Sequence, residues 1–180
     1  MKRSLPEKLV QMKKKNFHLS HLDGFEFQEA DQDTFDSWFN TEKGDHSKFL
    51  YSFAQDGTGG LFCLWNESRS NDFQNANVVY LSSEGDFGVL AANFDDFLSV
   101  LAGGLNLYDL IFYGNVTPYQ DLINDEDELL EAKTNHQKLV KWIQTEFQIR
   151  PEMDGPKILQ RGKHLLAPFK KWVVSRMGNY

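Results

Sequence analysis

The clearest pattern in the chain is a series of short apolar runs, separated by turns, between residues 49 and 104. Runs 49–54, 61–66, 78–83 and 87–92 alternate with the period of two that predicts β-strands. The links between them are short and rich in glycine or polar residues, which favours antiparallel hairpins because parallel crossovers are longer and usually helical. In run 61–66 both alternating sets are apolar, which predicts a strand covered on both faces.

A helix is predicted directly after the last run, over residues 94–102. Asn93 suits the N-cap, and Asp95 and Asp96 lie in the first turn, where the helix dipole favours acids. Gly103 and Gly104 provide the stop. The apolar positions follow helical spacing at Phe94, Phe97, Leu98 and Leu101.

Other elements follow from shorter signals. Residues 24–27 alternate like a first strand, residues 31–39 read as a short amphipathic helix, and residues 105–113 as another. Asp125 opens a long helix that ends before Pro151, and a last helix after Pro156 carries Pro168 near its first turn. The prediction is an α+β fold: a single domain, 1–180, with its core in 20–176, a twisted, mainly antiparallel sheet of four to six strands, and helices packed around it.

Composition fits a folded chain in a reducing compartment. Hydrophobic residues make up 41% and aromatic residues 14%, enough for a core without disulfides. Cys63 is the single cysteine, so no internal disulfide forms. The sequence has no apolar run of about 18 residues and no signal-peptide pattern, so we expect a cytoplasmic protein without a membrane span.

Charge is unevenly distributed along the chain. The net charge of −7 is the balance of +5 in residues 1–16, −18 in residues 17–156 and +6 in residues 157–180. Residues 1–16 are thus a basic arm or helix. An acidic body repels nucleic-acid phosphate and attracts cationic partners. Two other interpretations stay open: a solvated surface that keeps the protein soluble, and basic ends that fold back against the acidic body.

Motifs for catalysis or cofactor binding are incomplete. The glycines at 57–60 lack the lysine of a phosphate loop and precede a strand, so a hairpin turn is expected. The five histidines are scattered without metal-ligand spacing, and Cys63 alternates with core residues. Glu84 and Asp86 flank Gly85 and form the one acidic pair that suggests a hydrolase, although such residues in a tight turn are usually just solvated. We expect no catalytic residues, no metal and no cofactor.

Protein-binding residues are predicted in three places. Trp65 and Tyr80, with polar tips near strand ends, are the aromatic residues expected to reach a surface. Glu84 and Asp86 form the second place. The third is a dense acidic run, which is either an ordinary helix start or a docking surface for a basic partner; its candidate binding residues are Asp121, Asp125, Glu126, Asp127 and Glu128.

Several strings resemble the SUKH superfamily, which includes fungal regulators of cell-wall assembly and many bacterial immunity proteins. The strings are QDGTGG at 55–60 with a strand ending in Trp65, VVYLSSEGDFGVLA at 78–91 and NFDDFL at 93–98, supported by GFEF at 24–27 and FKKWV at 169–173. The resemblance implies an α+β fold with a mainly antiparallel sheet. It also implies, for many bacterial members, binding and neutralisation of a toxin, and it transfers no active-site residue.

The leading functional hypothesis is therefore a non-enzymatic protein-binding module, an immunity protein that masks a toxin domain of basic charge. The alternatives are a regulatory scaffold like the fungal relatives and, third, a hydrolase acting through Glu84 and Asp86. The sequence leaves the oligomeric state open.

Overall fold

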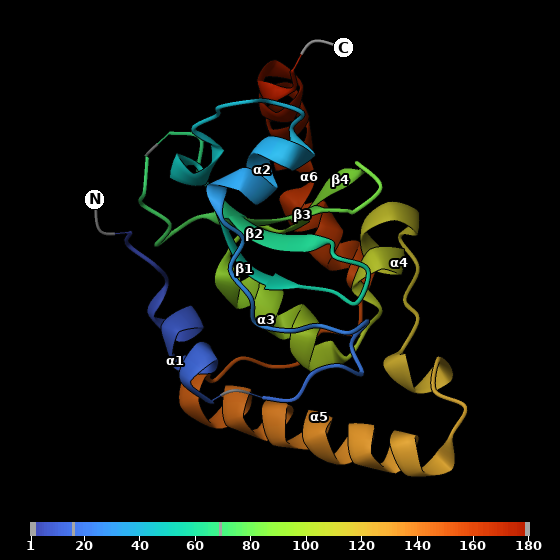
Figure 1. Cartoon of the computed structure of the whole chain (residues 1–180). Helices are drawn as coiled ribbons and strands as arrows, with labels where there is room; N and C mark the ends of the chain where they lie inside the picture. Colours follow the sequence, from blue (N-terminus) through green and yellow to red (C-terminus); the bar gives the residue numbers. More distant parts are fainter. Residues whose placement is uncertain (1–2, 16, 69, 179–180) are drawn as a thin grey trace.

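The computed structural model describes residues 3–15, 17–68 and 70–178 (Figure 1). Elements and bounds run in chain order: α1 Glu7–Lys15, α2 Gln32–Trp38, η1 His46–Lys48, β1 Leu50–Gln55, β2 Leu61–Trp65, β3 Asn77–Leu81, β4 Phe87–Ala91, α3 Phe94–Gly103, α4 Leu107–Tyr113, η2 Tyr119–Asp121, α5 Glu126–Phe147 and α6 Gly155–Arg176. The fold is α+β, as predicted.

The four strands form one antiparallel sheet in the order β1-β2-β3-β4, which confirms the four runs and the hairpin links. The polar segment between Trp65 and Asn77 is a hairpin loop, because these two residues pair across it. The register shifts once between β1 and β2 and once between β3 and β4.

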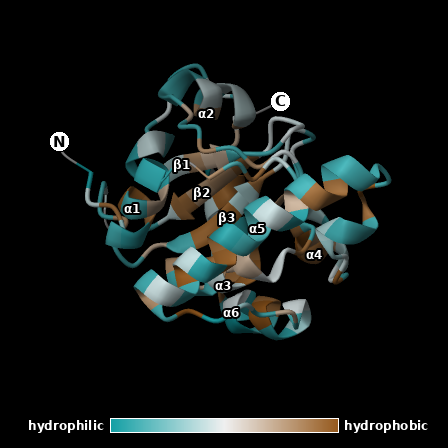
Figure 2. Ribbon diagram, turned by 90° about the horizontal axis from the view of Figure 1, so that it is seen from below, coloured by the Kyte–Doolittle hydropathy of each residue, from teal (hydrophilic) through white to brown (hydrophobic). Residues whose placement is uncertain are grey.

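Helices cover both faces of the sheet (Figure 1). On one face, Phe53, Phe62 and Tyr80 belong to a buried cluster that includes residues of α3 and α5. On the other, Cys63 and Trp65 belong to a second cluster. The prediction that β2 is covered on both faces is therefore confirmed, since all five of its residues are buried. Figure 2, viewed from below, shows hydrophilic residues along α5 and hydrophobic strands behind it.

The helix boundaries match their sequence signals closely. Asn93 caps α3 by accepting a hydrogen bond from the backbone N–H of Asp96 at 2.8 Å, and Gly104 ends the helix with a φ of 68°. Asp31 caps α2 in the same way. The long helix α5 begins one residue after Asp125 and ends four residues before Pro151, as predicted.

Two predictions of local structure are wrong. Residues 24–27 form no strand: Glu26 makes an isolated bridge to Gln55, because Gly24, with a φ of 72°, turns the chain just before it. Pro168 lies deep inside α6, not near its first turn. That helix begins at Gly155 with Pro156 in its first turn, where a missing N–H costs nothing. Pro168 is on the exposed side.

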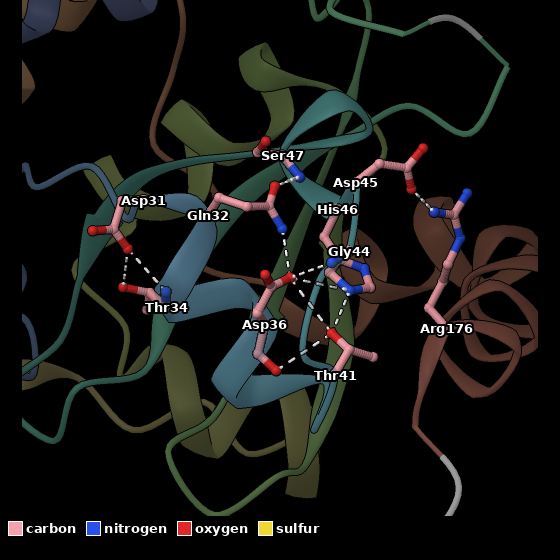
Figure 3. A network of polar contacts seen from close by, with 10 residues as sticks. All are labelled: Asp31, Gln32, Thr34, Asp36, Thr41, Gly44, Asp45, His46, Ser47 and Arg176. Atoms are coloured by element: carbon pink, nitrogen blue, oxygen red, sulfur yellow. Dashed lines mark hydrogen bonds and ion pairs between the residues drawn. The ribbon is translucent and has the colours of Figure 1, made fainter.

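A polar network joins α2 to η1 above the second face of the sheet (Figure 3). Asp36 Oδ1 accepts hydrogen bonds from Gln32 Nε2 at 2.6 Å and from the N–H of Gly44 at 2.9 Å. His46 lies beside Asp36, with its ring stacked on that of Phe39 at 4.1 Å between centroids. The network fixes the connection that holds α2 over the sheet.

Candidate functional site

The β1–β2 turn, the β3–β4 turn, Asp23 and helix α4 enclose a small pocket of about 270 Å³. Three carboxylates that lie between 28 and 61 positions apart in the sequence line the pocket: Asp23, Asp56 and Glu84. Its other lining residues are Thr58, Ser82, Ser83 and Tyr108. The β1–β2 and β3–β4 turns and helix α4 lie toward the same side of the molecule, at the right of Figure 1, where α5 also begins.

Asp56 is held rigidly by the β1–β2 turn. Its Oδ1 accepts hydrogen bonds from the N–H of Thr58 at 2.8 Å and the N–H of Gly60 at 2.9 Å. Its Oδ2 accepts one from the hydroxyl of Tyr80. The glycine cluster therefore serves a hairpin turn, as predicted, and Gly59 has a φ of 89°.

Gly60 is required for this arrangement because a Cβ there would overlap the Tyr80 hydroxyl. Gly24 is required for a second reason: its φ is 72°, and a Cβ would approach the Cα of Gly57 to 2.7 Å. The N–H of Gly57 donates to the carbonyl of Asp23 at 2.8 Å. The segment of residues 23–24 is thus pressed against the hairpin turn, which brings Asp23 and Asp56 together.

Asp23 is a half-buried carboxylate with no cation beside it among the described residues. It accepts hydrogen bonds from Asn106 Nδ2 at 2.6 Å and from the N–H of Leu107 at 3.1 Å, at the start of α4. Burial raises the pKa of Asp23, the charges of Asp56 and Asp109 raise it further, and the backbone hydrogen bond from Leu107 partly opposes this. A cation in the pocket would favour the charged carboxylate.

The prediction that Trp65 and Tyr80 reach a surface is wrong. Tyr80 is 1% exposed, with its hydroxyl turned inward to Asp56, and burial raises its pKa. Trp65 is 3% exposed and packs against Phe169 of α6, with ring centroids 4.9 Å apart. Both side chains belong to the core because helices close both faces of the sheet.

Glu84 and Asp86 are exposed in the β3–β4 turn, around Gly85 with its φ of 91°. Glu84 lines the pocket and Asp86 does not. The N–H of Asp86 donates to Ser82 Oγ at 2.9 Å, which closes the turn. The structure brings Glu84 together with Asp23 and Asp56, so the carboxylate partners of Glu84 in the pocket are residues that the sequence pattern did not single out.

The acidic run from residue 121 to residue 131 is exposed on η2 and the first turns of α5. Asp125 is the N-cap of α5, since its Oδ1 accepts a hydrogen bond from the N–H of Glu128 at 2.8 Å. The six carboxylates make no ion pair within the part of the chain that the structure describes: Asp121, Asp125, Glu126, Asp127, Glu128 and Glu131.

Exposed apolar side chains accompany these acids. Tyr113, Val116, Leu122 and Leu130 are each between 47% and 66% exposed. The first turns of α5, at the right of Figure 2, accordingly mix hydrophilic and hydrophobic colours. Exposed apolar groups among charged ones are the usual composition of a protein-binding surface. We call the pocket together with residues 113–131 the acidic end.

The basic ends of the chain pair with acids away from the acidic end. Lys8 lies 2.5 Å from Asp95, and Arg161 lies 2.6 Å from Asp96. Further pairs join Lys13 to Glu29 and Arg176 to Asp45. The interpretation that the ends fold back against the acidic body is confirmed. Each exposed pair stabilises the fold by at most about 1 kcal/mol. Because these basic side chains pair elsewhere, they do not neutralise the carboxylates of the acidic end.

Histidines, cysteine and other groups of metal-binding type form no site here. No cluster of three or more such side chains suited to a metal ion occurs among the described residues. Cys63 is fully buried, which raises the pKa of its thiol. No helix within the described residues is long and apolar enough to cross a membrane.

In comparisons with family models, curated proteins and solved structures, nothing matches this chain. The SUKH resemblance stays a prediction from the sequence.

Sequence reasoning missed Asp23, Asp56 and Tyr108 as members of one pocket. A signal was present for the first two, because Asp23–Gly24 and Asp56–Gly57 are both Asp-Gly pairs, which are typical of tight turns. Nothing in the sequence shows that the two turns touch, or that α4 places Tyr108 beside them.

Proposed function

We propose that this chain is a non-enzymatic protein-binding module, specifically an immunity protein of the SUKH kind that binds and neutralises a basic toxin domain. One observation carries the proposal: the acidic end holds carboxylates, in the pocket and on α5, that have no cationic partner within the described chain. The α+β fold with an antiparallel sheet agrees with what the resemblance implies.

The proposed binding has a long-range step and a short-range step. The unpaired acids on η2 and α5 attract a basic partner and speed its association. A lysine or arginine side chain of the partner then enters the pocket, where Asp23, Asp56 and Glu84 surround it. Tyr108 lines the same pocket and offers its ring to a cation. The exposed apolar side chains, Leu122 and Leu130 among them, supply the apolar contact area.

A co-expression experiment tests the role. Toxin domains encoded beside this gene are expressed with and without the chain, and survival and co-purification are measured. We expect protection of the cells and recovery of a complex. Recovery of no toxin, together with no protection, would sink the immunity role, and recovery of a housekeeping partner would favour the regulatory scaffold instead.

Charge variants test the surface. Reversal of three acids at the acidic end, Asp121→Lys, Glu126→Lys and Asp127→Lys, should slow association at least about tenfold at low salt. The matched control reverses three exposed acids elsewhere, Asp33→Lys, Glu42→Lys and Glu67→Lys, with the same change in net charge. Equal loss in both variants would show that net charge matters and location does not. Glu84→Lys tests the pocket directly.

A further inference from the structure

Helices α4 and α6 both pack on strand β4, and a groove of about 590 Å³ remains between them. Gly162 of α6 lies so close to the strand that a Cβ there would come within 3.1 Å of Val89 Cγ1. From the other side, the side chain of Ile111 in α4 would lie 2.4 Å from a Cβ at Gly88. The two helices therefore cover β4, so an occupant of the groove contacts side chains and does not pair with the strand.

The two helices meet at the start of α6, which bounds the groove at one end. A Cβ at Gly155 would lie 2.2 Å from Leu110 Cδ1, and Pro156, the next residue, lines the groove. The volume of the groove lies within about 300–1,000 Å³, the range typical of small-molecule sites. The groove is separate from the acidic pocket, because the two share no lining residue.

The walls of the groove are apolar and only partly shielded from water. Ile111 and Phe112 of α4 and Leu159 of α6 are half-buried, and Leu166 of α6 is 45% exposed. An apolar occupant would remove this surface from water, which is the main favourable contribution to binding at such a site. The walls therefore favour a ligand with an apolar body.

One rim of the groove is polar and positively charged. Of the twelve lining residues, Gln160 and Lys163 are the two with polar side chains. Both are exposed, and they lie three positions apart on α6, so they are neighbours on one face of the helix. Lys163 takes part in no ion pair within the part of the chain that the structure describes. A carboxylate at this rim would accept hydrogen bonds from the ammonium group and from the amide.

We propose that the groove binds a small amphipathic anion, an acyl carboxylate of the fatty-acid class. Its apolar chain lies between α4 and α6, and its carboxylate lies beside Gln160 and Lys163. A neutral apolar ligand would leave Lys163 unpaired, and a cationic ligand would be repelled by it. This site does not depend on the proposed immunity role, because its charged group is basic and is not one of the acids of the acidic end.

Calorimetric titration of the full chain with decanoate, below the concentration at which decanoate forms micelles, tests the proposal. We expect saturable binding of one molecule per chain. In the series from butyrate to decanoate, each added CH₂ should tighten binding about two- to fourfold until the groove is filled. Decanol, which has the same chain without the charge, should bind at least about fivefold more weakly.

Substitutions on α6 test the location of the ligand. Lys163→Gln removes the charge at the rim, and Leu166→Glu places a second carboxylate in the groove, so each should weaken decanoate binding at least about fivefold. Lys170→Gln and Val174→Glu make the same changes at exposed positions of α6 outside the groove. These two controls should alter the affinity less than about twofold.

Methyl NMR locates the ligand without any substitution. With the isoleucine methyl groups labelled, decanoate should shift the resonance of Ile111 and leave that of Ile143, which is fully buried in α5, unchanged. The absence of saturable binding throughout the series would overturn the proposal. Equal affinities for decanoate and decanol would overturn it too, as would a bound ligand that neither shifts Ile111 nor responds to Leu166→Glu, because that ligand lies elsewhere.

Discussion

The hydroxyl of Tyr80 on β3 donates a hydrogen bond to the carboxylate of Asp56, in the turn between β1 and β2. The bond crosses from the core to the pocket, so the side chain that anchors the acidic pocket is itself fully buried. Stability and site geometry are therefore coupled through one hydroxyl.

Tyr80→Phe should destabilise the fold by about 1–3 kcal/mol, because it leaves a buried carboxylate oxygen without its donor. Chemical denaturation measures the change in the free energy of unfolding. Tyr113→Phe removes a hydroxyl from a side chain that is 65% exposed and serves as the control, with an expected change under about 0.5 kcal/mol. Equal effects would show that the Tyr80 bond contributes nothing particular.

Two neighbouring glycines should respond differently to alanine. Gly60→Ala places a methyl group against the Tyr80 hydroxyl and should cost about 2 kcal/mol or more, since the buried ring must move. Gly59→Ala meets no atom within 4 Å and should cost only about 1 kcal/mol, from its left-handed backbone. Thermal unfolding of both variants gives the comparison, and the reverse order would contradict the steric argument.

Asp125 combines a structural and a proposed binding role, and two substitutions separate them. Asp125→Ala removes the N-cap of α5 and should cost about 1 kcal/mol. Asp125→Asn retains a capping oxygen and removes the charge, so stability should stay within about 0.5 kcal/mol of the wild type. Urea denaturation checks both values, and a large loss in the asparagine variant would show that the charge, not the cap, stabilises the helix.

Acid should destabilise the protein through a buried histidine pair. His136 Nε2 donates to the carbonyl of Ala102 at 3.0 Å, so its Nδ1 accepts from His21 Nε2 at 3.2 Å, and both rings are neutral. Burial, followed by the charge of His136, lowers the pKa of His21 to about 4. Burial also lowers the pKa of His136.

The unfolded chain therefore binds protons first as the pH falls below about 6.5, and stability is lost between pH 6.5 and about 4. Denaturation midpoints across this range measure the loss. In His21→Phe the dependence should flatten, whereas exposed His164→Gln should leave it unchanged. Identical curves for His21→Phe and the wild type would exclude this pair as the cause.

The elements with strong local signals were predictable from the sequence. Helix α3 shows this best, because its cap at Asn93 and its stop at Gly104 act through neighbouring residues. The four strands were predictable for the same reason, since alternation and turn chemistry are local.

Relations over long distances in sequence were not predictable. The hydrogen bond between Asp23 and Asn106 joins residues 83 positions apart, and it holds Asp23 beside the start of α4, where the pocket forms. The sequence alone suggests that the polar tip of Trp65 reaches a surface. In the structure, the ring of Phe169 packs against Trp65. From the sequence alone, Pro168 suggests a helix start, because a proline inside a helix costs a hydrogen bond. In the structure, the packing of Phe169, Trp172 and Val173 outweighs this cost.

The position of α6 in the chain has a consequence for folding during synthesis. The sheet spans residues 50–91, and neighbours in its strand order are neighbours in sequence, so it can pair early. The second face of the sheet is covered only when Phe169, Trp172 and Val173 have been synthesised, about 80 residues after β4. Synthesis adds roughly 5–20 residues per second. For several seconds, therefore, Trp65 and its neighbours are exposed on the nascent chain. A chaperone that recognises apolar strands can bind them during this time.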